Sequence, residues 1–337
     1  TNYLSYMGKV NKLNINATLG MELQGGTSTT VGVVAYGVPE DANLQYISAH
    51  KDATKFQMSG GKGQNRLMSF YGRLNLSYDS RYMLTATVRG DGSSRFDSSE
   101  RWGTFPSFAA GWNIYNESFI ADNNTPISQL KLRAGWGKVG NQASAGEFGY
   151  VSTVNDGYNY VFNKNLVSGA VQLQLPNKEL TWESAEQYNV GLDFGFLDNT
   201  LTGNVDYFVR KTEDMIISKP IPLYAGKSRP YVNAGTMENK GVEASISYNN
   251  HIGDFTYGIS INASWIKNEV TSLAGGDPIY AGKVGRFEGY TTCTEEGREI
   301  AAFWGKRTDG IIKTQAQLDA YKAQLPNTSA QLGDVAF

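Results

Sequence analysis

The sequence contains a single cysteine, Cys293, among its 337 residues, so it cannot form an internal disulfide or a zinc site built on several cysteines. It also lacks any run of roughly 18 apolar residues that could cross a membrane as a helix. Neither sign of charge dominates, because 30 Lys and Arg residues stand against 32 Asp and Glu residues and give a net charge of −2. This balance excludes a basic nucleic-acid-binding scaffold, so we expect no nucleic acid partner.

Motifs for catalysis and cofactor binding are absent as well. The sequence has only two histidines and contains no Gly-x-Ser-x-Gly, His-Glu-x-x-His or Cys-x-x-Cys. Residues 135–140, GWGKVG, match the dinucleotide pattern Gly-x-Gly-x-x-Gly, but they end an alternating segment and no helix pattern follows. We interpret this match as coincidence and expect no enzyme activity, no cofactor and no metal site.

What the sequence does contain favours a β-protein. Glycine is abundant at 38 residues, and Tyr (20) outnumbers Phe (15). Long segments alternate between apolar and polar residues, which is typical of strands with one apolar face. These segments form five hairpins: residues 3–9 with 13–23, 67–78 with 82–89, 108–115 with 130–138, 187–196 with 201–210, and 242–248 with 255–265. The pattern predicts about ten strands, and residues 300–308 could form an eleventh.

Strand and loop lengths distinguish a membrane barrel from a soluble sandwich. Segments of roughly 11 residues would span the apolar band of an outer membrane when tilted, whereas sandwich strands are about half as long. Short connections alternate with long ones, and aromatic residues gather near the short turns, as at an interfacial girdle. The fold we predict is therefore all-β: a transmembrane antiparallel up-and-down β-barrel with short periplasmic turns and long extracellular loops. Cross-strand aromatic pairing in a soluble sheet remains the alternative.

The long connections carry aromatic side chains that could stack on sugar rings or on apolar peptide side chains. They could equally form a small core of the loops themselves. The rings predicted to lie in these connections are Trp102, Phe105, Tyr150, Tyr158, Tyr160, Phe162, Trp182, Tyr224, Tyr231, Tyr280, Phe287 and Tyr290.

Several longer motifs are more specific than this general pattern. Residues 91–112 read DGSSRFDSSERWGTFPSFAAGW, and LKLRAGWGKVGNQ follows from residue 130. Three further motifs come in order: LTWESAEQYNVGLDFGFLDNTLTGNVDYFVRKTEDMI from residue 180, NAGTMENKGVE from 233 and TEEGREIAAFWGKRTDGIIKTQAQLDAY from 294. Together they strongly resemble the SusC/RagA-like family of TonB-dependent outer-membrane transporters, and the resemblance covers most of the chain.

The resemblance implies a larger barrel of twenty-two strands, a plug domain and a TonB box that precede the barrel, and a SusD-like surface lipoprotein as lid. Substrates of such transporters are typically oligosaccharides or peptides, imported with energy delivered by TonB. The chain begins at Thr1 without Met and ends at Phe337 within a motif, so we interpret residues 1–337 as part of one receptor barrel domain, with the plug and TonB box outside it.

The function we predict is TonB-dependent active import of oligosaccharides or peptides across the Gram-negative outer membrane, where the wall also contacts lipid. The alternative is a passive porin or an adhesin barrel. Substrate should contact long-loop residues and lumen-facing strand ends. The candidate binding residues are Trp102, Tyr158, Tyr160 and Tyr231 as stacking surfaces and Arg95 as a polar partner. Asp91 and Arg95 could instead pair and hold their loop against the barrel.

Overall fold

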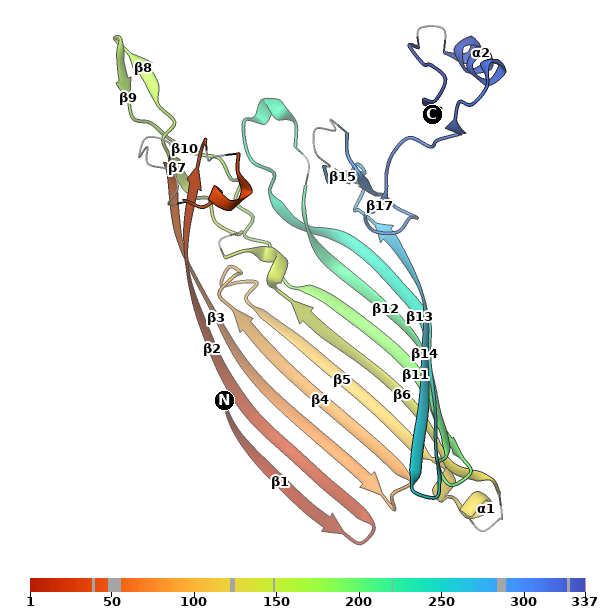
Figure 1. The fold of residues 1–337 in the computed structure, drawn as a ribbon. Coiled ribbons are helices and arrows are strands. Elements are labelled where there is room, and N and C mark those ends of the chain that lie inside the picture. The colour runs from red at the N-terminus through yellow and green to blue at the C-terminus, as the bar shows by residue number, and fades with distance from the viewer. Residues whose placement is uncertain are drawn as a thin grey trace.

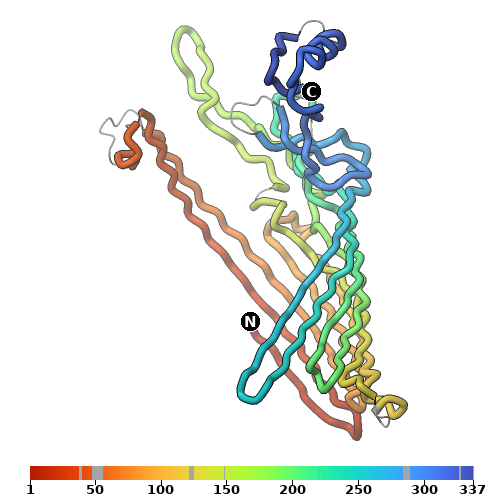
Figure 2. Tube along the Cα trace, turned by 45° about the vertical axis from the view of Figure 1, so that its right-hand side comes forward, coloured from red at the N-terminus to blue at the C-terminus, as the bar shows by residue number. Residues whose placement is uncertain are grey.

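The computed structural model describes residues 1–37, 40–47, 56–121, 125–147, 149–219, 221–283, 289–325 and 328–336. Within them, ten strands form one antiparallel sheet in the order β1-β2-β3-β4-β5-β6-β11-β12-β13-β14. The strands are β1 (Asn2–Val10), β2 (Leu13–Ala35), β3 (Phe56–Tyr78), β4 (Tyr82–Ser93), β5 (Trp102–Asn113), β6 (Ile127–Asn141), β11 (Glu183–Phe196), β12 (Leu201–Ser218), β13 (Tyr231–Ile252) and β14 (Phe255–Ser272). The sheet curves, and its edge strands β1 and β14 do not pair with each other, so it forms an open section of barrel wall (Figures 1 and 2). The predicted fold class is confirmed.

The two faces of this wall differ as the alternation predicted. Leu84 pairs with Leu76 on one side and Ala110 on the other, and Phe108 stacks on Trp136 with ring centroids 5.8 Å apart. This apolar face is not covered by a core, because Leu84 is 46% exposed. It is the face that lipid would cover, and we call it the outward face. The residues of opposite parity, which include Thr85, form the polar inward face, towards the barrel lumen.

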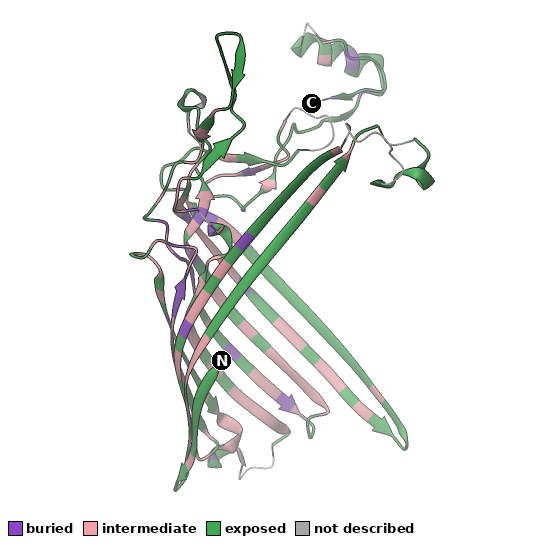
Figure 3. Cartoon of the chain, turned by 90° about the vertical axis from the view of Figure 1, so that its left-hand side faces the viewer, coloured by how far each residue is buried: buried purple, intermediate pink, exposed green. Residues whose placement is uncertain are grey.

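Several strand boundaries differ from the prediction. The strands are longer than 11 residues in most cases, and β2 and β3 each have 23 residues that pair from Leu13↔Tyr78 to Ala35↔Phe56. Their upper halves rise above β1 and β4 as a two-stranded ribbon (Figure 3). The alternation was harder to detect there because residues 24–35 and 56–66 are rich in Gly, Ser and Thr. Residues 300–308 do not add the eleventh wall strand that the pattern allowed: they contribute β17 (Ala302–Phe303) to a small sheet with β15 (Ile279–Ala281) and β16 (Thr292–Thr294).

Tight turns join the strands at one end of the sheet. The β3–β4 turn has positive φ at Asp79 (53°) and Ser80 (55°), the conformation of a type I′ turn whose twist matches that of the paired strands. Short polar side chains tolerate this conformation better than bulky ones. The β13–β14 turn is tighter than predicted, because pairing continues to Ile252↔Phe255.

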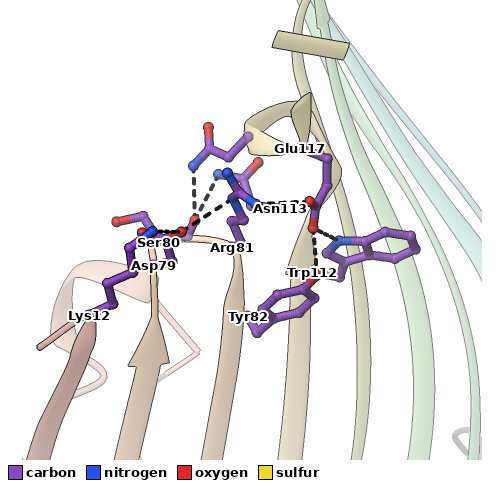
Figure 4. A network of polar contacts seen from close by, with 9 residues as sticks. Lys12, Asp79, Ser80, Arg81, Tyr82, Trp112, Asn113 and Glu117 are labelled. Carbon is purple, nitrogen blue, oxygen red and sulfur yellow. Dashed lines mark hydrogen bonds and ion pairs between the residues drawn. The ribbon is translucent and has the colours of Figure 1, made fainter. Parts of the chain in front are cut away.

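A polar network holds three neighbouring connections together at this end (Figure 4). Lys12, from the β1–β2 turn, donates to Asp79 at 2.8 Å. Glu117 follows the 3-10 helix η4 (Ile114–Asn116) and accepts from Tyr82 Oη at 2.6 Å, Trp112 Nε1 at 3.0 Å and Arg81 at 3.2 Å. These donors hold the pKa of the Glu117 carboxyl below its ordinary value, the tyrosine hydroxyl contributing most. The network fixes the rim of the wall at the short-turn end.

The opposite end of the sheet carries the long connections and the remaining small elements. These are η1 (Ala42–Leu44), η5 (Ala143–Ala145), β7 (Val154–Asp156), β8 (Tyr160–Phe162), β9 (Asn165–Val167), β10 (Ala170–Gln172), η6 (Leu223–Ala225), β18 (Gly310–Ile311), α2 (Gln315–Gln324) and β19 (Val335–Ala336), while α1 (Ser118–Ala121) lies at the short-turn end. The helix α2 packs Leu318 against Ile312, Ala330 and Ala336 as a separate small core. No helix among the described residues is long and apolar enough to cross a membrane.

Candidate functional site at the barrel mouth

A packed aromatic cluster lies where the β4–β5 and β6–β11 connections meet the top of the wall. Phe96 and Leu180 are fully buried, and Trp182 is 7% exposed. The Trp182 ring lies 5.3 Å from Phe96 and 5.4 Å from Phe105 between centroids. Ala145 and Ile216 complete the cluster. We call these six residues the mouth cluster. Aromatic and aliphatic burial of this extent holds both connections against the wall instead of leaving them in solvent.

Arg95 lies beside this cluster and binds the β6–β11 connection. Its guanidinium donates to the carbonyls of Ala143 at 3.0 Å and Gln142 at 3.3 Å, and Ser93 Oγ contacts the Gln142 side chain. The suggested Asp91–Arg95 pair is wrong, because Asp91 accepts two bonds from Arg89 Nε at 2.8 and 3.0 Å. Arg95 does hold its loop, as the alternative role predicted, but its partners are backbone carbonyls of the β6–β11 connection and not Asp91.

Arg89 extends the polar surface of the inward face beside the mouth cluster, since it pairs with Phe105 across β4 and β5. Besides Asp91, it donates to Ser69 Oγ at 2.9 Å and approaches Glu22 at 3.5 Å. Arg89 and Asp91 line a recess of about 360 Å³ together with Phe105 and Trp182. The recess combines a partly neutralised charge pair with the edges of aromatic rings. That combination suits a ligand with both hydrogen-bonding and apolar groups.

Tyr158 and Tyr160 lie on a hairpin that projects from the mouth. The pairs β7–β10 and β8–β9 form this hairpin, with Tyr160 opposite Val167 (Figure 1). Both tyrosines are exposed, Tyr160 by 72%. The base of the hairpin is held by the β12–β13 connection, because Ser228 N–H donates to the Leu173 carbonyl at 2.8 Å. The structure therefore confirms that both rings are accessible on an extended loop.

Tyr231 contacts the segment of the β6–β11 connection that follows this hairpin. It is the first residue of β13, and its carbonyl accepts from Asn177 Nδ2 at 2.9 Å. Two residues later, Asn233 exchanges side-chain bonds with the Thr181 backbone, accepting at 2.9 Å and donating at 3.0 Å. Asn233 was not among the predicted site residues, although its motif was one of those that carried the family resemblance.

Trp102 and Phe105 were predicted to lie in a long connection, and both placements are wrong. They belong to β5, and the true connection is only residues 94–101. Trp102 points to the outward face, because its register partners Gly92 and Met68 occupy outward positions of β4 and β3. It also stacks on the outward ring of Phe70, with centroids 6.1 Å apart. Phe105 has the opposite parity and faces inward. The position of Trp102 disfavours contact with a substrate in the lumen.

Of the other aromatic rings predicted to lie in loops, some are exposed and some pack into a core of the loops, the two possibilities that the sequence left open. Trp182 is buried in the mouth cluster, whereas Phe162 and Tyr224 are exposed by 69% and 92%. Tyr280 packs against Tyr290 and Trp304 in the region of β15–β17. Phe287 lies outside the described residues. Among the residues that the structure describes, no three His, Cys, Asp or Glu side chains are grouped so that they could hold a metal ion.

An open, antiparallel wall with an apolar outward face, a polar inward face and long folded loops at one rim defines an outer-membrane β-barrel protein. Residues 1–328 match the profile of the family described as "TonB dependent receptor-like, beta-barrel". The chain belongs to this family, and its likeness to SusC and RagA proteins places it among the SusC/RagA-like members in the outer membrane.

Individual relatives support this assignment. The chain is 41% identical over 237 residues to the TonB-dependent receptor SusC of Bacteroides thetaiotaomicron, which covers 69% of this chain and 23% of the relative. It is 35% identical to TonB-dependent receptor P3 of Formosa agariphila, over 80% of this chain and 27% of the relative. A structure of the RagAB peptide transporter superposes with a TM-score of 0.75 at 27% identity, covering 92% of this chain and 33% of that one. The chain thus spans about a quarter to a third of these proteins.

Proposed function

We propose that this wall forms part of a TonB-dependent importer of oligosaccharides or peptides, working with a SusD-like lid lipoprotein. In this proposal residues 1–337 are part of a single barrel domain, and the plug domain and TonB box come from other parts of the receptor. The observation that supports it best is the pairing of a polar inward face with long connections held over its upper end by the mouth cluster. Passive porins also have a polar interior and long loops, so it is the match to the TonB-dependent receptor family that favours an energised importer over a passive barrel.

The chemistry of the inward face favours neutral, hydrogen-bonding substrates. One row of paired residues runs Asn16, Asn75, Thr85, Ala109, Gly135 and Asn189 across six strands. The Arg133 guanidinium on the same face is neutralised by Asp193 at 2.7 Å and Asp206 at 3.0 Å. Amide and hydroxyl groups match sugar hydroxyls and peptide amides, whereas a strong field of one sign would favour ions. The name of the RagAB peptide transporter supports peptides as one of the two classes.

Within this proposal Tyr158, Tyr160 and Tyr231 remain candidate stacking residues, and Arg95 acts by holding the loops. The test is uptake of labelled peptides and oligosaccharides by cells that express the full-length receptor, with and without TonB and a protonophore. Uptake that requires both TonB and the proton gradient supports active import. Uptake that persists without either would favour the passive barrel.

Alanine variants of the three tyrosines then test binding, with receptor abundance at the surface measured in parallel. A loss of uptake at normal abundance supports contact with substrate. A loss that only follows abundance would show that these rings stabilise the loops.

A further inference from the structure

Charged side chains form a band on the outward face, at the long-loop end of five consecutive strands. We call it the outer ladder. Its members are Lys138 on β6, Glu186 on β11, Lys211 and Glu213 on β12, Glu238 and Lys240 on β13, and Lys267 and Glu269 on β14. The ladder contains four cations and four carboxylates, so it has no net charge. Charged residues on a lipid-facing surface need a reason, since each is costly within hydrocarbon.

The height of the outer ladder is marked by aromatic residues directly beneath it. Trp136 and Tyr188 both donate to Glu186, at 2.6 and 2.7 Å, and Trp265 precedes Lys267 by two positions on the same face. Such rings mark the interface between headgroups and hydrocarbon. Below them the outward positions of these strands are apolar or small: Leu132, Ala134, Val190, Leu192, Val205, Ala244, Ile246, Ile261 and Ala263. The outer ladder therefore lies at the level of the lipid headgroups of the outer leaflet.

The signs of charge alternate across the strands from β6 to β13, whereas like charges stand opposite each other between β13 and β14, where Lys240 pairs with Lys267 and Glu238 with Glu269. In register, Lys138 pairs with Glu186, Glu186 with Lys211, and Lys211 with Glu238. Neighbouring strands are about 4.8 Å apart, so Lys138 and Lys211 each have a carboxylate at about that distance to the side. Lys240 and Lys267 have their carboxylates on their own strands instead. Along the strands, Lys211 binds Glu213 at 2.6 Å, and the equivalent pairs on β13 and β14 are 3.1 and 2.8 Å long. These side chains remain between 33% and 52% exposed, so they can exchange partners with a ligand.

We propose that the outer ladder binds zwitterionic lipid headgroups that carry one phosphate and one primary ammonium, as in a phosphoethanolamine group. The lysines bind the phosphate and the glutamates bind the ammonium. A two-carbon linker joins these two groups and separates their charges by about one strand spacing. A polyanionic headgroup would find no net attraction, because the ladder is neutral. A phosphocholine headgroup would bind less well, since its quaternary ammonium has no N–H to donate to a carboxylate. This site is independent of the substrate proposed above.

The test measures the association of spin-labelled lipids with the full-length receptor reconstituted in phosphatidylcholine vesicles. Labelled phosphatidylethanolamine should associate about three- to tenfold more strongly than labelled phosphatidylcholine or phosphatidylglycerol, the range that a few surface ion pairs supply. The triple variant Lys211→Gln, Lys240→Gln, Lys267→Gln should lose this preference. The matched control is Lys131→Gln with Arg210→Gln, which removes cations from the inward face of β6 and β12 and should keep it.

A second variant guards against misfolding of the first. Exchanging signs within each pair, with Lys211→Glu and Glu213→Lys and the same swap on β13 and β14, keeps one ion pair on each of the three strands and a ladder without net charge, and should retain the preference. Equal association of all three lipids would overturn the proposal, and so would stronger binding of phosphatidylglycerol, which would indicate a simple cationic patch. Retention of the preference in a folded triple variant would overturn it as well.

Discussion

Replacing Phe96 with Ala tests whether the mouth cluster positions the loops. Phe96 is fully buried although it lies in a connection of only residues 94–101, and its ring packs 5.3 Å from that of Trp182. The two residues are far apart in the sequence, so their contact joins two separate connections. Removing the phenyl ring should therefore loosen the β6–β11 connection as well as its own.

The size of the effect follows from the burial. Truncating a buried Phe to Ala typically costs about 3 to 5 kcal/mol, because transfer free energy is lost and a cavity remains. The ten-stranded sheet does not depend on this ring, so the cost should fall on local opening of the mouth and not on the barrel. By the factor of ten for each 1.4 kcal/mol, local opening should become roughly 10² to 4 × 10³ times more frequent.

Hydrogen exchange of the full-length receptor in detergent measures this directly. Amides of residues 142–182 should lose protection in Phe96→Ala, while amides of β4 and β11 keep theirs. The matched control is Phe162→Ala, the same change at a ring that is 69% exposed. Unchanged protection of 142–182 in Phe96→Ala would show that the mouth cluster does not hold the β6–β11 connection. Equal losses in both variants would contradict the prediction too, since burial would then not be the cause.

The sheet could be predicted from the sequence because its cause is local. Each strand alternates between a lipid-facing and a lumen-facing position, so residues such as Leu84 and Thr85 reveal the two faces without any knowledge of the partners. The prediction lost accuracy where this cause is absent. The upper ribbon of β2 and β3 stands above both lipid and lumen, both of its faces are exposed, and its sequence therefore alternates little.

The site could be predicted only in part, because its contacts join distant segments. That Phe96, Leu180 and Trp182 would bury one another cannot be read from their spacing. The error at Trp102 was avoidable in principle. Trp102 shares even-numbered parity with Phe108 and Trp112, whereas Phe105 has the opposite parity. Continuing the outward alternation back from Trp112 would have placed Trp102 on the lipid-facing side.

Three further predictions concern the wall and its two rims. Leu84→Arg should destabilise the barrel by about 2 to 4 kcal/mol, and Thr85→Arg by much less, when unfolding from lipid vesicles is followed by urea titration; similar costs at both sites would contradict the assignment of the faces. Gly63→Ala should weaken one contact of the β6–β11 connection, since a methyl group there would meet the Glu147 carboxylate, which accepts from the Gln64 backbone N–H at 3.0 Å. Protease should then cleave that connection faster than in the wild type, and an unchanged cleavage rate would contradict this role of the contact. The last prediction follows from Glu117, whose pKa is lowered in the folded rim from an ordinary value of 4.5 by its tyrosine, indole and guanidinium donors. A carboxyl with a depressed pKa stabilises the folded state fully above the unfolded pKa, and this stabilisation is lost as the pH falls through the folded pKa. Stability of the wild-type barrel should therefore fall below about pH 4.5, whereas Glu117→Gln, which cannot ionise, should be less stable at pH 7 and should lack this part of the acid dependence. Parallel pH profiles for the two proteins would mean that the rim network contributes nothing through its charge.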